Sequence, residues 1–334
     1  MEVEVQPSEH GISNLKADPL PWLLSGEPVV RWWTWRDLLD RPAADPELSA
    51  AYAAARESAA AQTILAAQRP SGAWIAERHL YSPKHTATTW QLDLLADFGF
   101  TAADEPVRRA CQLFLAWQLP SGDFGLFAGA KTGGPCATGR ILCQFHRFGL
   151  GDDPQVARAW DWLATTQRAD GGWHCRAAIM RSAKPSCFLA TVKVLEACRA
   201  AGDTASDLAR GAARFVHSCL MEPRVERYTS PTLWSRLVYP NHWYDAVSVV
   251  DLLVSFGYGA GDERMAAAVA LIRQKQNADG TWNHDSELAF HGPTLYNFGP
   301  VGAPSPWVTF RAMRAIKRAG NQGLGNQEIR GLIP

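Results

Sequence analysis

The sequence predicts an all-α protein, an (α/α)6 barrel in which inner and outer helices alternate around one axis. Two observations carry this prediction. A seven-residue motif recurs at a nearly constant interval, which indicates a repeat architecture, and the intervals are filled by pairs of helical patterns. No alternating strand pattern competes with the helices anywhere in the 334 residues.

The motif reads Gln, two residues, Ser or Asp, Gly, one residue, and then Trp or Phe. One copy is Gln167-Arg-Ala-Asp-Gly-Gly-Trp173, and the others begin at Gln68, Gln118 and Gln276. The four glutamines are 50, 49 and 109 residues apart, so we expect a degenerate copy at 219–223. A helical run precedes each copy, and Gly supplies the positive φ that ends a helix and reverses the chain. The motif therefore predicts a staple between repeats, with the aromatic ring packed on the glutamine, rather than a catalytic site.

The helical segments divide into outer and inner members of two-helix units. Proline near a helix start and glycine after its end are the expected asymmetry. The expected outer helices are 46–67, 105–117, 154–166, 206–220 and 262–275, and the expected inner helices are 27–40, 91–99, 135–149, 185–199, 240–253 and 304–317. These segments predict one toroid domain at 27–320, preceded by an N-terminal arm at 1–26 and followed by a C-terminal tail at 321–334.

The four motif copies resemble the QW motif of the superfamily that contains squalene-hopene cyclases, terpenoid cyclases and protein prenyltransferases. More narrowly, the chain resembles short bacterial proteins described as containing prenyltransferase and squalene oxidase repeats. The resemblance extends from about Glu27 to Arg318. It implies the (α/α)6 toroid. The resemblance does not distinguish a cyclase from a zinc-dependent prenyltransferase or from a non-enzymatic binding domain.

Composition excludes several classes of protein. The net charge is zero, so no basic surface is expected to bind nucleic acid or an anionic membrane. No apolar run reaches 18 residues, so no transmembrane segment is expected, and the acidic N-terminus does not predict a signal peptide. Seven cysteines without a disulfide-like spacing favour reduced thiols and a cytoplasmic protein.

In such a barrel we expect the N-terminal ends of the inner helices to converge on a central cavity lined by aromatic rings. Helix N-termini favour anions. The residues expected at the rim are Lys84, His85, Thr86, Cys136, Thr138, Ser186, Cys187, His242, Trp243, Tyr244, Asp245 and Trp307. Arg236 is a further candidate, because arginine binds a diphosphate or a carboxylate. The expected ligand is an isoprenoid or another apolar small molecule, and a prenyl diphosphate is one form of it.

Acid-initiated cyclisation or isomerisation is the first reaction expected. Full-length cyclases of the superfamily carry their acid in an Asp-x-Asp-Asp motif, which this chain lacks. Asp245 is then the best candidate acid, with His242 and Tyr244 relaying the proton. Cys136 is a candidate nucleophile, and Trp90 and Trp243 are candidates to stabilise a carbocation through their ring faces.

Two alternatives remain open. Zinc-dependent prenyltransferases hold the metal with an Asp-x-Cys and a His at successive inner-helix starts. Cys187 and His242 occupy similar positions, and Cys136 or Cys175 could complete the set. Pro185, however, replaces the expected aspartate. The other alternative is a binding or scaffold toroid that has lost the chemistry. No cofactor other than zinc is expected.

Overall fold

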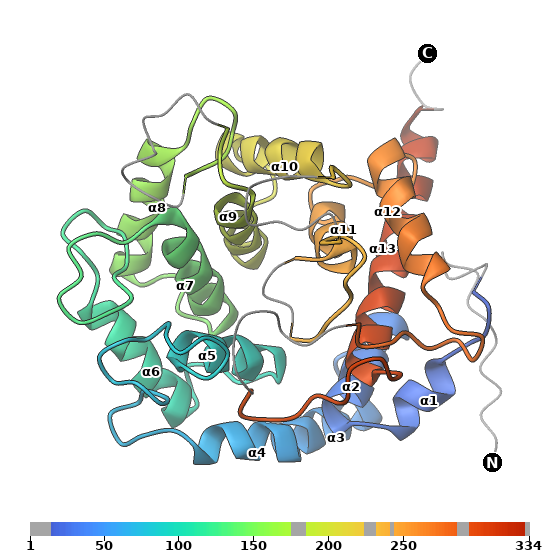
Figure 1. The fold of residues 1–334 in the computed structure, drawn as a ribbon, viewed down its shortest axis with the longest axis horizontal. Coiled ribbons are helices and arrows are strands. Elements are labelled where there is room, and N and C mark those ends of the chain that lie inside the picture. Colours follow the sequence, from blue (N-terminus) through green and yellow to red (C-terminus); the bar gives the residue numbers. More distant parts are fainter. Residues whose placement is uncertain (1–14, 175–184, 224–231, 241–243, 286–293, 331–334) are drawn as a thin grey trace.

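The computed structural model describes residues 15–174, 185–223, 232–240, 244–285 and 294–330. Their helices form a ring of two concentric layers (Figure 1). The inner layer consists of α2 (Pro28–Trp33) with the π-helix η1 (Thr34–Leu38), α5 (Thr88–Asp97), α7 (Pro135–Arg147), α9 (Phe188–Ala200), α11 (Ala246–Val254) and α13 (Pro306–Arg330). The outer layer consists of α1 (Leu20–Ser25), α3 (Pro46–Arg56), α4 (Ala59–Ala66), α6 (Glu105–Ala116), α8 (Pro154–Thr166), α10 (Asp207–Cys219) and α12 (Glu263–Gln274). The predicted all-α toroid is confirmed.

The recurring motif staples neighbouring units together, as predicted. Each glutamine follows an outer helix and donates two hydrogen bonds through its side-chain amide. One bond reaches the motif glycine carbonyl four residues on, and the other reaches a carbonyl at or before the start of another outer helix. For Gln167 these acceptors are Gly171 O at 2.9 Å and Leu208 O at 3.0 Å. Gly171 has a φ of +85°, the left-handed conformation that favours glycine.

The aromatic residue of the motif ties the outer layer to the inner one. The Trp173 indole donates to Leu163 O at 3.0 Å, and its backbone N–H donates to Thr191 Oγ1 at 3.1 Å. Trp74 and Trp282 make the same pair of bonds, and the Phe124 backbone repeats the threonine contact. Thr191 lies in the first turn of α9, so the motif fixes the start of an inner helix. The buried donors are satisfied at every copy, as buried polar groups require.

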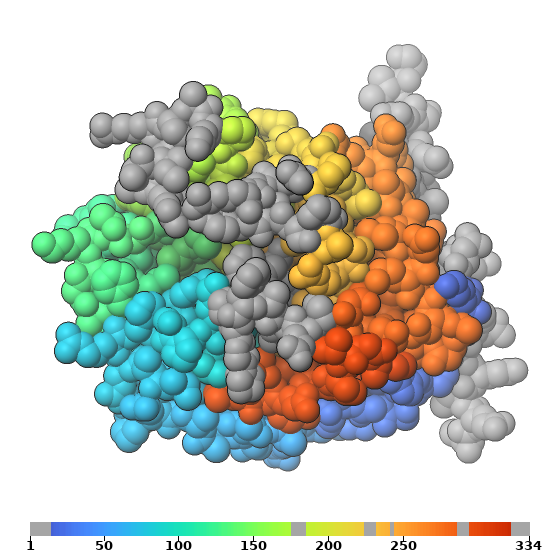
Figure 2. Space-filling view, viewed as in Figure 1, coloured from blue at the N-terminus to red at the C-terminus, as the bar shows by residue number. Residues whose placement is uncertain are grey.

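The last motif closes the ring. Gln276 donates to Gly280 O at 2.9 Å and to Ala17 O at 3.1 Å, and its own oxygen accepts from Lys16 N at 2.7 Å. The start of the described chain therefore occupies the place that the next outer helix takes in other copies. Figure 2 shows the consequence at the surface, where orange residues of the last unit lie beside blue residues of the first.

The degenerate copy after α10 uses a different tie. No motif glutamine is present there, and Arg264 of α12 instead donates backwards to Leu220 O at 2.8 Å. Trp234 takes the aromatic position, and its indole donates to Glu222 O at 2.7 Å. The hydrogen bond between neighbouring units is thus kept, but its donor, Arg264, belongs to the following unit instead of the preceding one.

Three boundaries differ from the prediction. The expected helix at 46–67 is two helices, because Ser58 begins α4 as an N-cap that accepts from Ala61 N. The described part of the expected arm joins the toroid, since Leu23 of α1 is fully buried and Ala17 takes part in ring closure. The last inner helix continues to Arg330, into the expected tail.

Among the residues described, no helix is both long enough and apolar enough to cross a bilayer. The same residues contain isolated β-bridges but no strand. Two of these bridges pair the motif glutamine with the motif aromatic residue, at Gln68 and Trp74 and at Gln118 and Phe124.

Replacing Gln276 with alanine tests ring closure. The change leaves the carbonyls of Gly280 and Ala17 without their donor, so we expect the free energy of unfolding to fall by about 2 kcal/mol. Urea denaturation followed by circular dichroism measures it. Gln274→Ala is the matched control, because Gln274 is an exposed glutamine only two residues earlier, at the end of α12. Equal stability of the two variants would contradict the closing role of Gln276.

Candidate functional site

A cavity of about 400 Å³ lies among the inner helices, and we call it the central cavity. Its volume is within the range of small-molecule sites, roughly 300–1,000 Å³. The described lining contains eight cationic side chains and four carboxylates. These are Arg36, Arg140, Arg147, Lys193, Arg199, Arg311, Arg314 and Arg318 against Asp93, Asp97, Glu196 and Asp251. The described lining therefore has a cationic excess.

Helical spacing brings these charges to the axis. Side chains three or four residues apart share one face of a helix, and the lining residues of each inner helix follow that spacing. Asp93 and Asp97 lie on α5, and Ser248 and Asp251 lie on α11. The remaining sets are Arg140, Cys143 and Arg147 on α7, Lys193, Glu196 and Arg199 on α9, and Arg311, Arg314 and Arg318 on α13.

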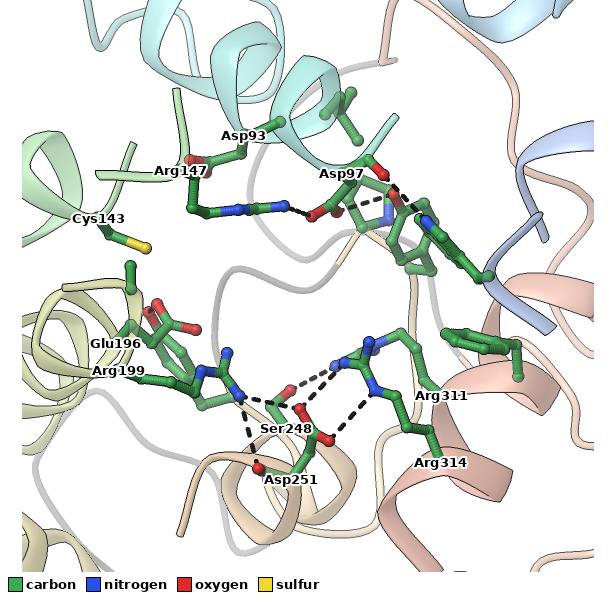
Figure 3. A pocket seen from close by; sticks show the side chains of 18 of the residues that line it. Asp93, Asp97, Cys143, Arg147, Glu196, Arg199, Ser248, Asp251, Arg311 and Arg314 are labelled. Carbon is green, nitrogen blue, oxygen red and sulfur yellow. Dashed lines mark hydrogen bonds and ion pairs between the residues drawn. The ribbon is translucent and has the colours of Figure 1, made fainter. Parts of the chain in front are cut away.

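Asp251 is the centre of the strongest charge cluster (Figure 3). Its carboxylate is bonded to Arg199 at 3.0 Å, to Arg314 at 3.0 Å and to Arg318 at 2.6 Å. Burial alone would raise the pKa of Asp251, but the three guanidinium groups outweigh it and hold that pKa far below its usual range. One carboxylate thus serves three arginines, and of these Arg314 has a second partner, Asp37, at 3.1 Å.

Arg311 lies one turn away and contributes to the same side of the cavity. It donates to Ser248 Oγ at 2.6 Å and to Val238 O at 2.7 Å. Its nearest carboxylate among the described residues is Asp245, at 3.7 Å. Figure 3 shows Arg199, Arg311 and Arg314 directed toward a common region beside Ser248 and Asp251. These groups form a cationic cluster that suits an anionic ligand, because a concave surface of one sign concentrates the opposite charge.

The opposite side of the cavity holds two paired carboxylates of α5. Asp97 bonds Arg147 at 2.6 Å and accepts from the Tyr239 hydroxyl at 3.1 Å. Asp93 bonds Arg140 and accepts from Gln144 Nε2 at 2.5 Å. Each carboxylate of this side already has a guanidinium partner, so these pairs add little net charge.

One wall is aromatic. Trp33, Tyr239 and Phe310 line the cavity, and Trp307 lies behind them. The rings of Tyr239 and Trp307 stack with centroids 4.9 Å apart, and those of Trp33 and Phe310 are 5.1 Å apart. The expected aromatic lining is therefore present on one side only, and most of the other described lining residues are charged.

Lys193, Glu196 and Tyr244 meet at the boundary of the cavity. The Tyr244 hydroxyl donates to Glu196 Oε2 at 2.5 Å, and Lys193 Nζ lies 5.3 Å from the Tyr244 ring centroid. Burial lowers the pKa of Lys193, and nearby Arg140 lowers it further. Burial raises the pKa of Tyr244 well above its usual value, and Glu196 adds to this, so the phenol keeps its proton at neutral pH.

A second hollow of about 230 Å³, which we call the side pocket, adjoins the first. Arg140 and Lys193 line both. The other described walls of the side pocket are mainly uncharged, and they include Tyr81, Thr89, Leu126, Phe127, Thr132 and Cys136. A charged cavity and a largely uncharged pocket thus share one wall.

The structure places the central cavity beside the later turns of α5, α7 and α9, not at their N-terminal ends, whereas the start of α11 does reach the cavity through Tyr244 and Ser248. The expectation that the N-terminal ends of all the inner helices converge on this cavity is therefore wrong. The first turns of α5, α7, α9 and α13 hold the threonines that bond the motif aromatic residues. Because those turns pack against the motif loops, the charged residues one or two turns later face the axis.

Asp245 and Tyr244 fall on opposite sides of the cavity wall. Tyr244 lines the cavity, whereas Asp245 lies behind it as the N-cap of α11. Asp245 Oδ1 accepts from Ser248 N and from Ser248 Oγ, both at 2.8 Å, while Oδ2 is buried without a hydrogen-bond partner among the described atoms. Since Ser248 lines the cavity, its hydroxyl connects Asp245 with the interior.

The other candidate residues are dispersed. Cys136 lines the side pocket, and Lys84 is partly exposed, with burial lowering its pKa. Trp90 is buried under the Arg140 guanidinium, 3.9 Å from the ring centroid. The rest have local contacts: His85 packs on Trp90, Ser186 bonds Asp170 at 2.7 Å, Cys187 N donates to Trp173 O at 2.7 Å, and Arg236 donates to Thr232 Oγ1 at 2.7 Å.

His242, Trp243 and Cys175 lie outside the described residues. Of the zinc ligands considered, Cys187 and Cys136 are therefore described, whereas His242 and Cys175 are not. Within the described ranges, no group of three His, Cys, Asp or Glu side chains could hold a metal ion.

Apart from Tyr244, the residues that line the central cavity were missed by reasoning from the sequence, although a signal was present. The inner helix Phe188–Ala200 is otherwise apolar, yet it carries Lys193, Glu196 and Arg199 at intervals of three, and Asp93 and Asp97 of α5 are four apart. A buried helix that keeps charged side chains on one face indicates a polar interior.

Comparison with known proteins yields remote likenesses. No family model matches the chain, and no curated protein matches it. A protein from Actinoplanes is 16% identical, with a TM-score of 0.45, over 88% of this chain and 89% of that one. The type II terpene cyclase MstE from Scytonema is 15% identical in its apo form, with a TM-score of 0.34, over 81% of this chain and 98% of that one. A variant of MstE in complex with merosterolic acid A, its product, is 12% identical, with a TM-score of 0.35.

Asp251→Asn tests the charge cluster. The change removes the carboxylate that three arginines share, so we expect the free energy of unfolding at pH 7 to fall by about 3 kcal/mol. Since the folded-state pKa of Asp251 is depressed, its stabilisation is complete above the unfolded pKa of about 4 and is lost as pH falls further. Urea denaturation at pH 7 and at pH 3 should show the difference between wild type and variant shrinking in acid. Asp161→Asn, on the exposed face of α8, is the control, and a difference independent of pH would refute the account.

Proposed function

We propose that the protein is an enzyme acting on an isoprenoid, or a similarly apolar molecule, that carries an anionic head group such as a diphosphate. The observation that carries this proposal is the cationic excess of the central cavity, eight basic side chains against four carboxylates. Behind the lining, Asp37 pairs with Arg36 and Arg314, and Asp245 lies 3.7 Å from Arg311, so part of this excess is already balanced. A neutral polyene would leave the remaining positive charge uncompensated in a confined space, where desolvated charge is costly. An anion compensates it.

The two hollows suit the two parts of such a molecule. Arg199, Arg311 and Arg314 are placed to bind the head group through several charge-assisted hydrogen bonds. The apolar chain fits the side pocket, whose walls include Leu126 and Phe127 and which begins where the central cavity ends.

Cyclisation or isomerisation started by an acid is one of the activities of the superfamily that the sequence resembles, and the aromatic wall supports it. Trp33, Tyr239 and Phe310 present rings to the cavity, and ring faces stabilise a carbocation. Asp245 is the proposed acid. In its protonated form it donates to Ser248 Oγ, which lies 2.8 Å from Asp245 Oδ1, and the serine passes its own hydroxyl proton to the substrate. Tyr244, hydrogen-bonded to Glu196, is the second proton-transfer group of the wall.

Geranyl diphosphate and geraniol test the anion requirement, since they share an apolar chain and differ in charge. We expect the diphosphate to bind at least about 100-fold more tightly, the equivalent of 2.7 kcal/mol from charge-assisted bonds. Isothermal titration calorimetry of the full chain measures both. Arg311→Gln should weaken the diphosphate and leave geraniol unchanged, while Arg108→Gln, an exposed residue of α6, should change neither. Equal affinity for the two compounds would overturn the proposal.

Asp245→Asn tests the acid. Asparagine caps a helix as well as aspartate does, so the fold should persist, while loss of a general acid should reduce turnover by about 100-fold or more. Product formation from prenyl diphosphates, followed by gas chromatography with mass spectrometry, measures it. Binding of the diphosphate should be retained. Tight binding by the wild type with no product from any prenyl diphosphate would favour the non-catalytic toroid.

A further inference from the structure

Lys193 occupies the wall between the central cavity and the side pocket and lines both. It is the one lysine among the eight cationic residues of the described lining, and the other seven are arginines. Arginine keeps its proton under all ordinary conditions, whereas a buried lysine can lose its proton and become a nucleophile or a base. The wall between the two hollows thus holds Lys193, which can act as a nucleophile or a base, whereas the seven arginines of the described lining cannot.

The surroundings of Lys193 favour a neutral amine. Its side chain is 6% exposed, and among the described residues no carboxylate oxygen forms an ion pair with it. Its amine nitrogen lies over the Tyr244 ring, 5.3 Å from the centroid, a contact that favours the protonated form and so acts against burial. Burial lowers the pKa of Lys193 and Arg140 lowers it further, although Cys136, Glu196 and Asp93 oppose the shift. Desolvation beside another cation is an established way to activate a lysine.

A proton-transfer pair lies next to this amine. The Tyr244 hydroxyl donates to Glu196 Oε2 at 2.5 Å, and Glu196 is three residues from Lys193 on α9. Figure 3 shows Glu196 directed into the cavity beside Arg199. Since the pKa of Tyr244 is raised, its phenol holds a proton at neutral pH and can donate it.

We propose that Lys193 forms an imine with an aldehyde or ketone carbonyl of an anionic substrate. The amine nitrogen attacks the carbonyl carbon, and a proton moves from nitrogen to oxygen to give the carbinolamine. The carbinolamine hydroxyl then takes a proton from the Tyr244 phenol and leaves as water while the C=N bond forms. The protonated imine returns its N–H proton to the Tyr244–Glu196 pair, so the pair ends as it began. One water is released and nothing is oxidised or reduced. The inference goes beyond the proposed function but rests on its anion site, where the arginines hold the anionic group and bring the carbonyl to Lys193.

Reduction of the imine in place tests this step. The full-length protein is incubated at pH 7 with glyoxylate, the smallest anionic aldehyde, or with pyruvate, and sodium borohydride is added. Peptide mapping by mass spectrometry should find the reduced adduct on Lys193 at a level about tenfold or more above that on Lys275, as expected for an activated lysine. Lys275 is ion-paired with Asp285 at 3.1 Å and serves as the internal control. Acetone, a neutral carbonyl, should label Lys193 far less than pyruvate.

Lys193→Arg keeps the charge and removes the nucleophile. We expect it to lose the adduct and to retain diphosphate binding by calorimetry, while Lys275→Arg keeps both properties. The peptide map of the wild-type protein tests imine formation at Lys193 even if the variant does not fold. Labelling of Lys193 no stronger than that of Lys275 with both anions would overturn the imine and leave diphosphate binding intact. Loss of diphosphate binding by the wild type would instead count against the proposed function.

Discussion

Two hydrogen bonds from each motif glutamine hold the toroid together. Gln68, Gln118, Gln167 and Gln276 each join the glycine of their own turn to a carbonyl of another unit. The fourth pair reaches Ala17 and closes the ring. An open array of helix pairs would leave an exposed apolar end, whereas a closed ring buries every inner helix on all sides but the axis. The axis is then the place that remains for charged side chains of the inner layer.

Closure thereby determines the character of the central cavity. Charges placed on the axis are partly desolvated, so each needs a partner. Asp93 and Asp97 have theirs in Arg140 and Arg147. Asp251 is shared by Arg199, Arg314 and Arg318, which leaves positive charge over. The anion site follows from this surplus, because unbalanced cations attract anions. The lowered pKa of Lys193 comes first from its burial inside the closed ring, and Arg140 lowers that pKa further.

The fold could be predicted from the sequence because its determinants are local and repeated. A glutamine, a glycine and an aromatic residue at fixed spacing specify each turn, and the segment from Gln167 to Trp173 contains all three. Ser58, which divides one expected helix into two, is also local but occurs once, and a single capping serine inside an alanine-rich run is a weak signal. The extent of the arm depended on a long-range contact between Ala17 and Gln276, which no local pattern reveals.

The site was harder to predict for a related reason. Expecting helix N-termini at the cavity directed attention to Asp245 and Cys187, which cap α11 and α9. The cavity is lined instead by residues such as Arg199, Glu196 and Asp251, whose grouping depends on how helices face one another across the axis. Tyr244, which was expected at the cavity rim, is among the described lining residues. Its partner Glu196 is 48 residues away in the chain and belongs to another helix.

The most direct test of the central claim is a crystal structure of the protein with inorganic diphosphate. The account predicts density for the anion inside the central cavity, bonded to at least two of Arg199, Arg311 and Arg314, with the Asp251 cluster intact. Density for the anion only on the outer surface, or an unchanged cavity at saturating diphosphate, would contradict it.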